Sequence, residues 1–180
     1  MQTPHPPIWI AANSDAAVRR AARLGDSLFV NPHATMPVIA GQMALYRAEL
    51  ARHGKAFPTV LPYLREIYCA KSKLTAVEIA GRYLAEKYRT YAHCGQDRVL
   101  PGQDSFRQSL EALSQDRFVL GSPEDCWEAL RPCWESVGAN FLIFRTQWSG
   151  MPVARALASM RLISDELLPA LRRVTPTAGG

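Results

Sequence analysis

The stretch from Pro7 to Asn31 constrains the fold of this chain most. It begins with an apolar run, residues 8–12, which is too short for a helix and rich in β-forming residues, so it predicts a buried strand. Asn13 and Ser14 are helix-capping residue types, and the ten residues after them place apolar side chains on one helical stripe that Gly25 ends. Residues 28–30 form a second apolar run. Strand, helix and strand in this order indicate a βαβ unit and a parallel sheet.

The rest of the chain continues this alternation. We predict four parallel strands, near residues 8–12, 27–31, 60–70 and 140–146. A helix begins after Thr35 and ends at Gly54, with an apolar stripe of Ile39, Met43, Tyr46 and Leu50. Further helices are expected from a Thr75–Glu78 capping box to about residue 91, from Ser122 to Gly138 and from residue 152 to 173. The buried face of the second of these is predicted to carry Trp127, Leu130, Trp134 and Val137. Residues 92–117 are predicted to be largely irregular, with one helical stretch at 105–113.

Ala12, Asn13 and Ser14 lie where the first strand ends, and this turn is a candidate anion site. Ligands of α/β proteins bind outside the carboxyl ends of the strands, where the following helix presents free backbone N–H groups. The alternative is ordinary helix capping, because every turn between a strand and a helix has a helix N-terminus.

Five segments together resemble the C-terminal half of the bacterial luciferase-like flavin monooxygenases. They read IAANSDAAVRRAARLGDSLFV, YRAELARHG, LPYLREIYCA, LGSPEDCWEAL and GANFLIF, and they occur in that family's order. The likeness runs from Pro7 to about Leu171. It implies a (β/α)8 barrel that holds a flavin at the carboxyl ends of its strands. The turn of Ala12, Asn13 and Ser14 would then help to hold the flavin phosphate, while a further hydroxyl of some members is replaced here by Ala17.

A complete TIM barrel usually needs about 250 residues, and this chain has 180. Its predicted strands supply about half of a barrel, and the first follows directly after residues 1–7. We therefore expect an α/β fold, the C-terminal half of a TIM-type (β/α)8 barrel, as a single partial domain over residues 1–180 with a frayed tail at 174–180. A half-barrel has two unpaired edges and leaves an apolar inner face uncovered, for which we expect Ile8, Ile10, Phe29, Leu142 and Phe144. These edges and this face would recruit an N-terminal half or a second copy.

Charge and cysteine usage narrow the functional classes. The net charge of +5 is spread along helices without interleaved aromatic residues, so neither nucleic acid nor membrane is expected as a partner. Cys69, Cys94, Cys126 and Cys133 lack C-x-x-C and zinc-ligand spacing, and free thiols in the cytoplasm are the natural interpretation. No metal site is predicted.

Five further polar residues receive a prediction. Arg65 and Glu66 are adjacent in a strand and so point to opposite faces, and at least one should pair with another strand or a helix as part of a structural ion pair. Arg145 and Gln147 follow the last strand, where barrel enzymes place functional groups, and are substrate-side candidates. A solvated position is expected for the loop residue His33 more than a flavin contact.

The absence of a catalytic triad or paired acids agrees with a flavin enzyme, in which the cofactor performs the redox step. The resemblance implies a luciferase-like monooxygenase that uses reduced flavin mononucleotide (FMN), supplied by a reductase, and dioxygen on a small organic substrate. Three alternatives remain open: deazaflavin-dependent hydride transfer on the same fold, a non-catalytic half-barrel that binds flavin or assembles with a partner, and an unrelated α/β domain. The catalytic residues and the substrate stay unassigned.

Overall fold

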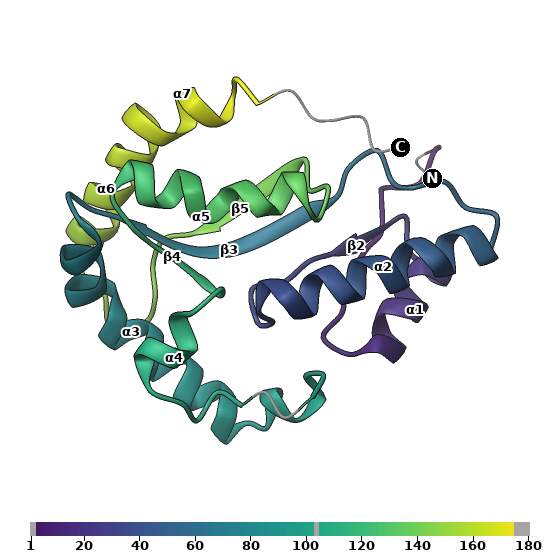
Figure 1. Cartoon of the computed structure of the whole chain (residues 1–180), viewed down its shortest axis with the longest axis horizontal. Helices are drawn as coiled ribbons and strands as arrows, with labels where there is room; N and C mark the ends of the chain where they lie inside the picture. The colour runs from purple at the N-terminus through teal and green to yellow at the C-terminus, as the bar shows by residue number, and fades with distance from the viewer. Residues whose placement is uncertain (1–2, 103–104, 175–180) are drawn as a thin grey trace.

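The computed structural model describes residues 3–102 and 105–174, which form an open, twisted parallel sheet with helices on both faces (Figure 1). The strands are β1 (Trp9–Ala11), β2 (Ser27–Phe29), β3 (Pro62–Cys69), β4 (Phe118–Gly121) and β5 (Phe141–Arg145). β1 pairs with β2, and β3 lies between β4 and β5. A bridge between Val30 and Tyr63 links the two groups, and every pairing is parallel. The predicted α/β class and the four predicted strands are confirmed, whereas β4 was not predicted.

The helices connect these strands in the expected alternation. They are α1 (Asp15–Leu24), α2 (Met36–Arg52), α3 (Lys73–His93), the 3-10 helix η1 (Gln96–Val99), α4 (Leu110–Ser114), α5 (Pro123–Glu135) and α6 (Val153–Leu162), followed by the π-helical turn η2 (Ile163–Leu167) and α7 (Leu168–Leu171). Among the described residues, no helix combines the length and the apolar character that crossing a membrane requires. The predicted frayed tail at 174–180 lies outside the described residues, apart from Val174.

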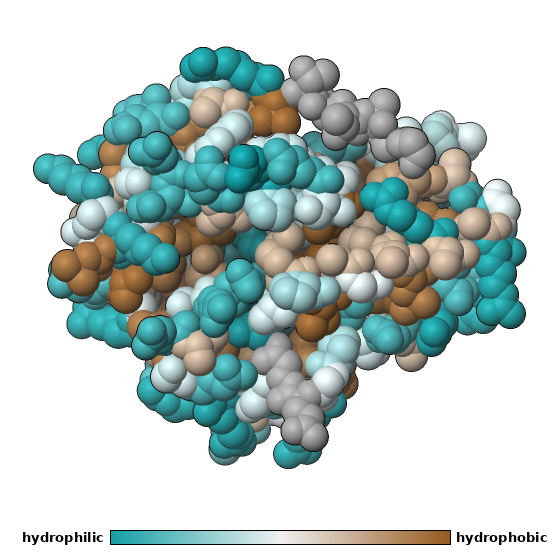
Figure 2. Space-filling view, in the orientation of Figure 1, coloured by the Kyte–Doolittle hydropathy of each residue, from teal (hydrophilic) through white to brown (hydrophobic). Residues whose placement is uncertain are grey.

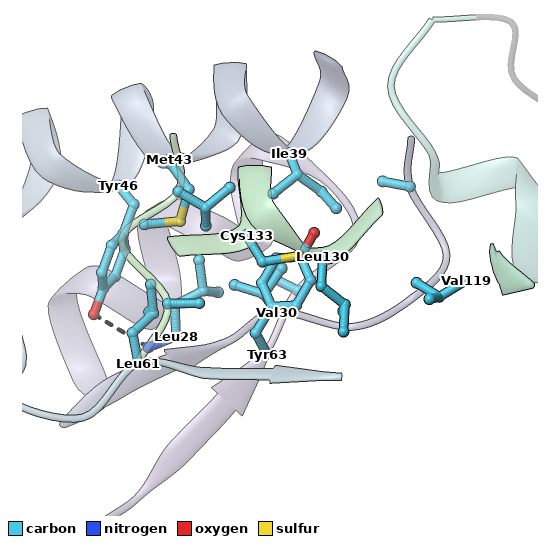
Figure 3. Packing of buried hydrophobic residues seen from close by; sticks show 14 of the residues in the cluster. Leu28, Val30, Ile39, Met43, Tyr46, Leu61, Tyr63, Val119, Leu130 and Cys133 are labelled. Atoms are coloured by element: carbon cyan, nitrogen blue, oxygen red, sulfur yellow. Dashed lines mark hydrogen bonds between the residues drawn. The ribbon is translucent and has the colours of Figure 1, made fainter. Parts of the chain in front are cut away.

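One face of the sheet packs against α1, α2 and α5 (Figure 1). The predicted stripe of α2 is confirmed, because Ile39, Met43, Tyr46 and Leu50 are all buried in this cluster. Figure 3 shows the Tyr46 hydroxyl directed at the backbone of Leu28, whose N–H lies 3.1 Å from it. This bond ties α2 to β2, so the helix that follows β2 is held firmly against the sheet.

The opposite face is covered only at the carboxyl ends of the strands. There α3 and the segment after it pack over β3 and β4 in a second cluster that includes Tyr68, Tyr88, Phe118 and Leu120. Closer to the amino ends the face is open and apolar: Trp9 and Phe141 are 39% and 47% exposed, and their rings touch at a centroid distance of 5.6 Å.

The register corrects which apolar side chains face inward. We expected Ile8, Ile10, Phe29, Leu142 and Phe144 on the inner face. Leu142 pairs with Tyr63 and Phe144 with Arg65, so both lie on the helix-covered face, as does Ile10. Alternation then leaves Trp9, Ala11, Phe29, Leu64, Phe141 and Ile143 on the open face. Only Phe29 was assigned correctly among the side chains that lie clearly on one face.

Several helix boundaries and faces also differ from expectation. Ser72, not Thr75, caps α3, because the Thr75 N–H donates to the Ser72 hydroxyl at 3.2 Å and Thr75 already lies in the first turn. α4 is shorter than the stretch predicted at 105–113. On α5 the buried face carries Cys126, Leu130 and Cys133, while Trp127 and Trp134 are half-buried and pack against each other with their ring planes tilted by 52°.

Candidate active site

The predicted anion turn lies at the carboxyl end of β1, as expected. Ala12 is buried, and Ser14 is the N-cap of α1, with its hydroxyl accepting from the N–H of Ala17 at 3.3 Å. Val18 N–H donates to the Ser14 carbonyl. The capping role of Ser14 is therefore real, and any ligand contact would come in addition to it.

Two amide side chains anchor the backbone carbonyls of this turn. Asn31 donates from Nδ2 to the Ala12 carbonyl, and Gln42 from Nε2 to the Asn13 carbonyl, each at 3.0 Å. Because N–H and C=O point in opposite directions across a trans peptide, anchoring these carbonyls fixes the orientation of the N–H groups of Asn13 and Ser14. Asn31 was a detectable candidate, since it follows β2 at the same edge of the sheet, whereas nothing in the local pattern around Gln42 marks it.

The donor set of the turn fits a phosphate group. The N–H groups of Asp15 and Ala16 precede the first intrahelical bonds of α1 and have no hydrogen-bond acceptor in the described chain. The Ser14 hydroxyl proton is also available, since Oγ only accepts within α1. Asn13 Oδ1 is buried without a partner, and a rotated amide would present its N–H₂ group instead. Together these groups can supply several donors to one oxyanion.

A second polar cluster surrounds Glu66 in the middle of β3. The carboxylate is fully buried, Lys87 of α3 donates to its Oε1, and Trp148 Nε1 donates to its Oε2. Arg145 Nη1 approaches Oε1 at 3.3 Å from the neighbouring strand β5. The expected ion pair with another strand or a helix is thus confirmed for Glu66. Arg65 points to the other face and does not take part.

The two substrate-side candidates are not brought together. Arg145 ends β5 on the open face and keeps 39% of its side chain exposed. The strand does not continue to Gln147, which is exposed and belongs to the loop beyond it. Trp148, which the sequence did not single out, takes the inward position instead. Arg145 therefore faces both Glu66 and the open side of the sheet.

His33 is only part-exposed, whereas a solvated position was expected. Its ring packs edge-on against Tyr91 and Phe106, at centroid distances of 5.3 and 5.8 Å, and its Nδ1 is buried without a hydrogen-bond partner. Burial lowers the pKa of His33 to about 4, and the nearby cations Lys87, Arg145 and Arg117 add to this effect. The imidazole is neutral at pH 7 and lies near the cations of the Glu66 cluster.

Comparison with protein families gives one match over most of the chain. The model of the luciferase-like monooxygenase family matches residues 1–140, a range that contains the Ala12–Ser14 turn, His33, Glu66 and Lys87. The matched range also contains β1 to β4 and the helices between them.

Solved structures of similar fold include two monooxygenases and a reductase. Monooxygenase RslO1 from Streptomyces bottropensis aligns with a TM-score of 0.71 and 22% identity, covering 94% of this chain and 50% of that one. The FMN complex of the oxygenating constituent of 3,6-diketocamphane monooxygenase from Pseudomonas putida aligns with a TM-score of 0.63 and 17% identity, covering 89% of this chain and 47% of that one. The coenzyme F420 dependent tetrahydromethanopterin reductase from Methanopyrus kandleri aligns with a TM-score of 0.63 and 11% identity, covering 91% of this chain and 50% of that one.

These likenesses establish the fold, which is the half-barrel portion of these larger chains. The chain spans about half the length of each of them, and 49% of a curated relative to which it is 24% identical.

Proposed function

The chain belongs to the luciferase-like monooxygenase family, and from this premise we propose that it forms the flavin-phosphate side of a flavin-dependent monooxygenase. The whole enzyme would oxidise a small organic substrate with dioxygen and reduced FMN from a flavin reductase. The observation that carries the proposal is the Ala12–Ser14 turn, which Asn31 and Gln42 hold at the carboxyl end of a parallel sheet. The four free cysteines support a reducing, cytoplasmic location.

The residues of this chain would bind and position the cofactor. The N–H groups of Asp15 and Ala16, the Ser14 hydroxyl and the Asn13 amide would bind the phosphate at the positive end of α1. The flavin ring, when bound, supplies the redox chemistry. Neutral His33 and the Glu66 carboxylate, whose two oxygens already accept hydrogen bonds, would exclude water from the same edge of the sheet.

Replacing Ser14 with alanine should weaken FMN binding by about 1 kcal/mol, the usual value of one hydrogen bond, or roughly fivefold in Kd. Quenching of FMN fluorescence in a titration measures this change. Ser14→Asp separates capping from phosphate binding, since aspartate caps the helix equally well but repels the phosphate. We expect Ser14→Asp to retain stability and to lose more affinity than Ser14→Ala.

Ser72→Ala is the matched control, because Ser72 caps α3 with the same geometry and lies outside the turn. It should lower stability without changing FMN affinity. An unchanged FMN affinity in both Ser14 variants would leave Ser14 with its capping role alone.

Two further candidates keep the same fold and site. A deazaflavin could bind this phosphate turn and support hydride transfer, since the structural neighbour from Methanopyrus kandleri is a coenzyme F420 dependent reductase. The chain could also be a non-catalytic half-barrel that binds flavin or assembles with a partner. FMN binding with oxygen-dependent turnover favours the monooxygenase. Tighter F420 binding with oxygen-independent turnover favours the deazaflavin enzyme. Flavin binding without turnover in the assembled protein favours the non-catalytic half-barrel.

Arg145 would lie on the substrate side of the assembled site. Its guanidinium is anchored through one contact with Glu66 and remains part-exposed on the open face. In an active assembly, Arg145→Met should raise KM for the substrate and leave the Kd of FMN unchanged, because the phosphate turn lies on another strand. Unchanged substrate kinetics would remove Arg145 from the site, and Gln147→Ala is the control for an exposed neighbour.

The open face points to a partner for the sheet. β1 and β5 each leave one edge unpaired within the described residues, and apolar side chains between them are exposed. Such edges and patches recruit further strands. We propose that an N-terminal half-barrel, or a second copy of this chain, covers this face and completes the support of the flavin ring.

A further inference from the structure

Arg65 is a buried cation that no carboxylate of the described residues neutralises. Only 2% of the residue is exposed, and it forms no salt bridge within residues 3–102 and 105–174. Its Nη2 donates to the Tyr63 hydroxyl and contacts Met36 Sδ at 3.1 Å, while its guanidinium stacks on the Tyr63 ring at 4.5 Å. Nη1 is buried without any partner. Buried charges in proteins are ordinarily paired, so this one calls for an anion.

A groove of about 1080 Å³ lies beside this side chain. Arg65 contributes to its lining together with Met36 of α2, the edge strand β4 and α5. In the view of Figure 2, which shares the orientation of Figure 1, hydrophilic residues follow α5 above a more apolar zone near β4. Met36 has a flexible thioether against the guanidinium, so a change of its rotamer can expose the arginine to the groove.

The N-terminus of α2 adds positive potential on the same side. α2 has 17 residues and begins at Met36, and its N-cap Thr35 makes no side-chain capping bond, although the Met36 N–H donates to the Asp116 carbonyl at 3.2 Å. The partial positive charge at the start of a helix favours an anion there. The buried guanidinium and the helix end thus act in the same direction.

The rim of the groove has the opposite character. Glu111 of α4 and Glu124 of α5 line it without a salt bridge in the described part of the chain. Three further acidic residues, Asp116, Asp125 and Glu128, also belong to the lining, whereas its cations besides Arg65 are Lys73 and Arg117. This arrangement repels a polyanion such as a nucleotide and attracts an ammonium group. A ligand with one carboxylate and one ammonium group can pair with Arg65 inside the groove and with the acidic residues at its rim.

We propose that this groove binds a small zwitterionic carboxylate, whose carboxylate pairs with Arg65 and whose ammonium group remains near Glu111 and Glu124. The site uses the helix-covered face of the sheet, opposite to Glu66, and it is independent of the flavin turn. Because the ligand neutralises a buried charge, its binding should stabilise the fold.

Three probes of similar size test this proposal by calorimetry and by thermal unfolding of the full chain: β-alanine, propionate and ethylammonium. β-Alanine should bind saturably and raise Tm, propionate should bind more weakly, and ethylammonium should not bind. Arg65→Met should weaken β-alanine binding by about tenfold or more, the effect of losing a charge-assisted bond, and should raise the Tm of the unliganded protein. Glu111→Gln with Glu124→Gln should remove the preference for β-alanine over propionate.

Arg65→Lys is the second variant in case Arg65→Met does not fold. It keeps the charge but loses the planar fork, so carboxylate binding should weaken while the protein remains folded. Ethylammonium binding as tight as that of β-alanine, no saturable binding of either carboxylate, or binding that Arg65→Met and Arg65→Lys leave unchanged would overturn the proposal.

Discussion

Replacing Glu66 with alanine should lower the free energy of unfolding by about 3–5 kcal/mol, the usual effect of removing one member of a buried ion pair. The fully buried carboxylate accepts from Lys87 of α3, from Arg145 of β5 and from Trp148 in the loop after β5. Burial already lowers the pKa of Lys87 although Glu66 opposes this shift. Without Glu66, the ammonium and the indole N–H would remain buried with no acceptor.

Urea unfolding at pH 7 measures this loss. Glu86→Ala is the control, because Glu86 pairs with Arg89 on the exposed face of α3, the helix that also carries Lys87. Exposed ion pairs contribute about 0.2–1 kcal/mol to stability. A loss for Glu66→Ala as small as that for Glu86→Ala would contradict the structural role assigned to the cluster.

Acidification should destabilise the protein through His33. The pKa of His33 is about 4 in the fold against 6.5 for the free side chain, because of burial first and then of Lys87, Arg145 and Arg117. Below pH 6.5 the unfolded chain therefore binds a proton that the folded chain rejects. The stability linked to His33 is complete above pH 6.5 and declines by about 3 kcal/mol as the pH falls towards 4.

His33→Phe isolates this contribution, because phenylalanine keeps the edge-on contacts with Tyr91 and Phe106 but cannot titrate. The variant should lose less stability between pH 7 and pH 4.5 than the parent, whereas a variant of the exposed His93 should match the parent. Parallel pH profiles for His33→Phe and the parent would show that His33 titrates normally in the fold.

Elements with local sequence signals were predictable. The start of a helix is determined by residues within one or two turns, as for Ser14 before α1 and Ser122 with Pro123 before α5. The buried face of α2 follows in the same way from the spacing of Ile39, Met43, Tyr46 and Leu50. β4 was missed because it follows a polar, irregular segment and is defined by pairing with β3 about 50 residues earlier in the chain.

The face assignment of the strands failed for a different reason. Strands of a parallel sheet are apolar on both faces, so the alternation that fixes orientation is absent, and a shift of one residue exchanges the faces. Ile10, Leu142 and Phe144 illustrate this error. The partners of Glu66 were also beyond local patterns, since Lys87 and Trp148 lie 21 and 82 residues away.

Sedimentation velocity with simultaneous detection of protein and FMN absorbance tests the central claim most directly. The claim is that this chain carries the flavin-phosphate turn of a luciferase-like fold on a sheet whose open face requires further strands. We predict self-associated species larger than a monomer, with FMN co-sedimenting in substoichiometric amounts that Ser14→Asp reduces further. A monodisperse monomer with stoichiometric flavin and full oxygenase turnover would contradict the account.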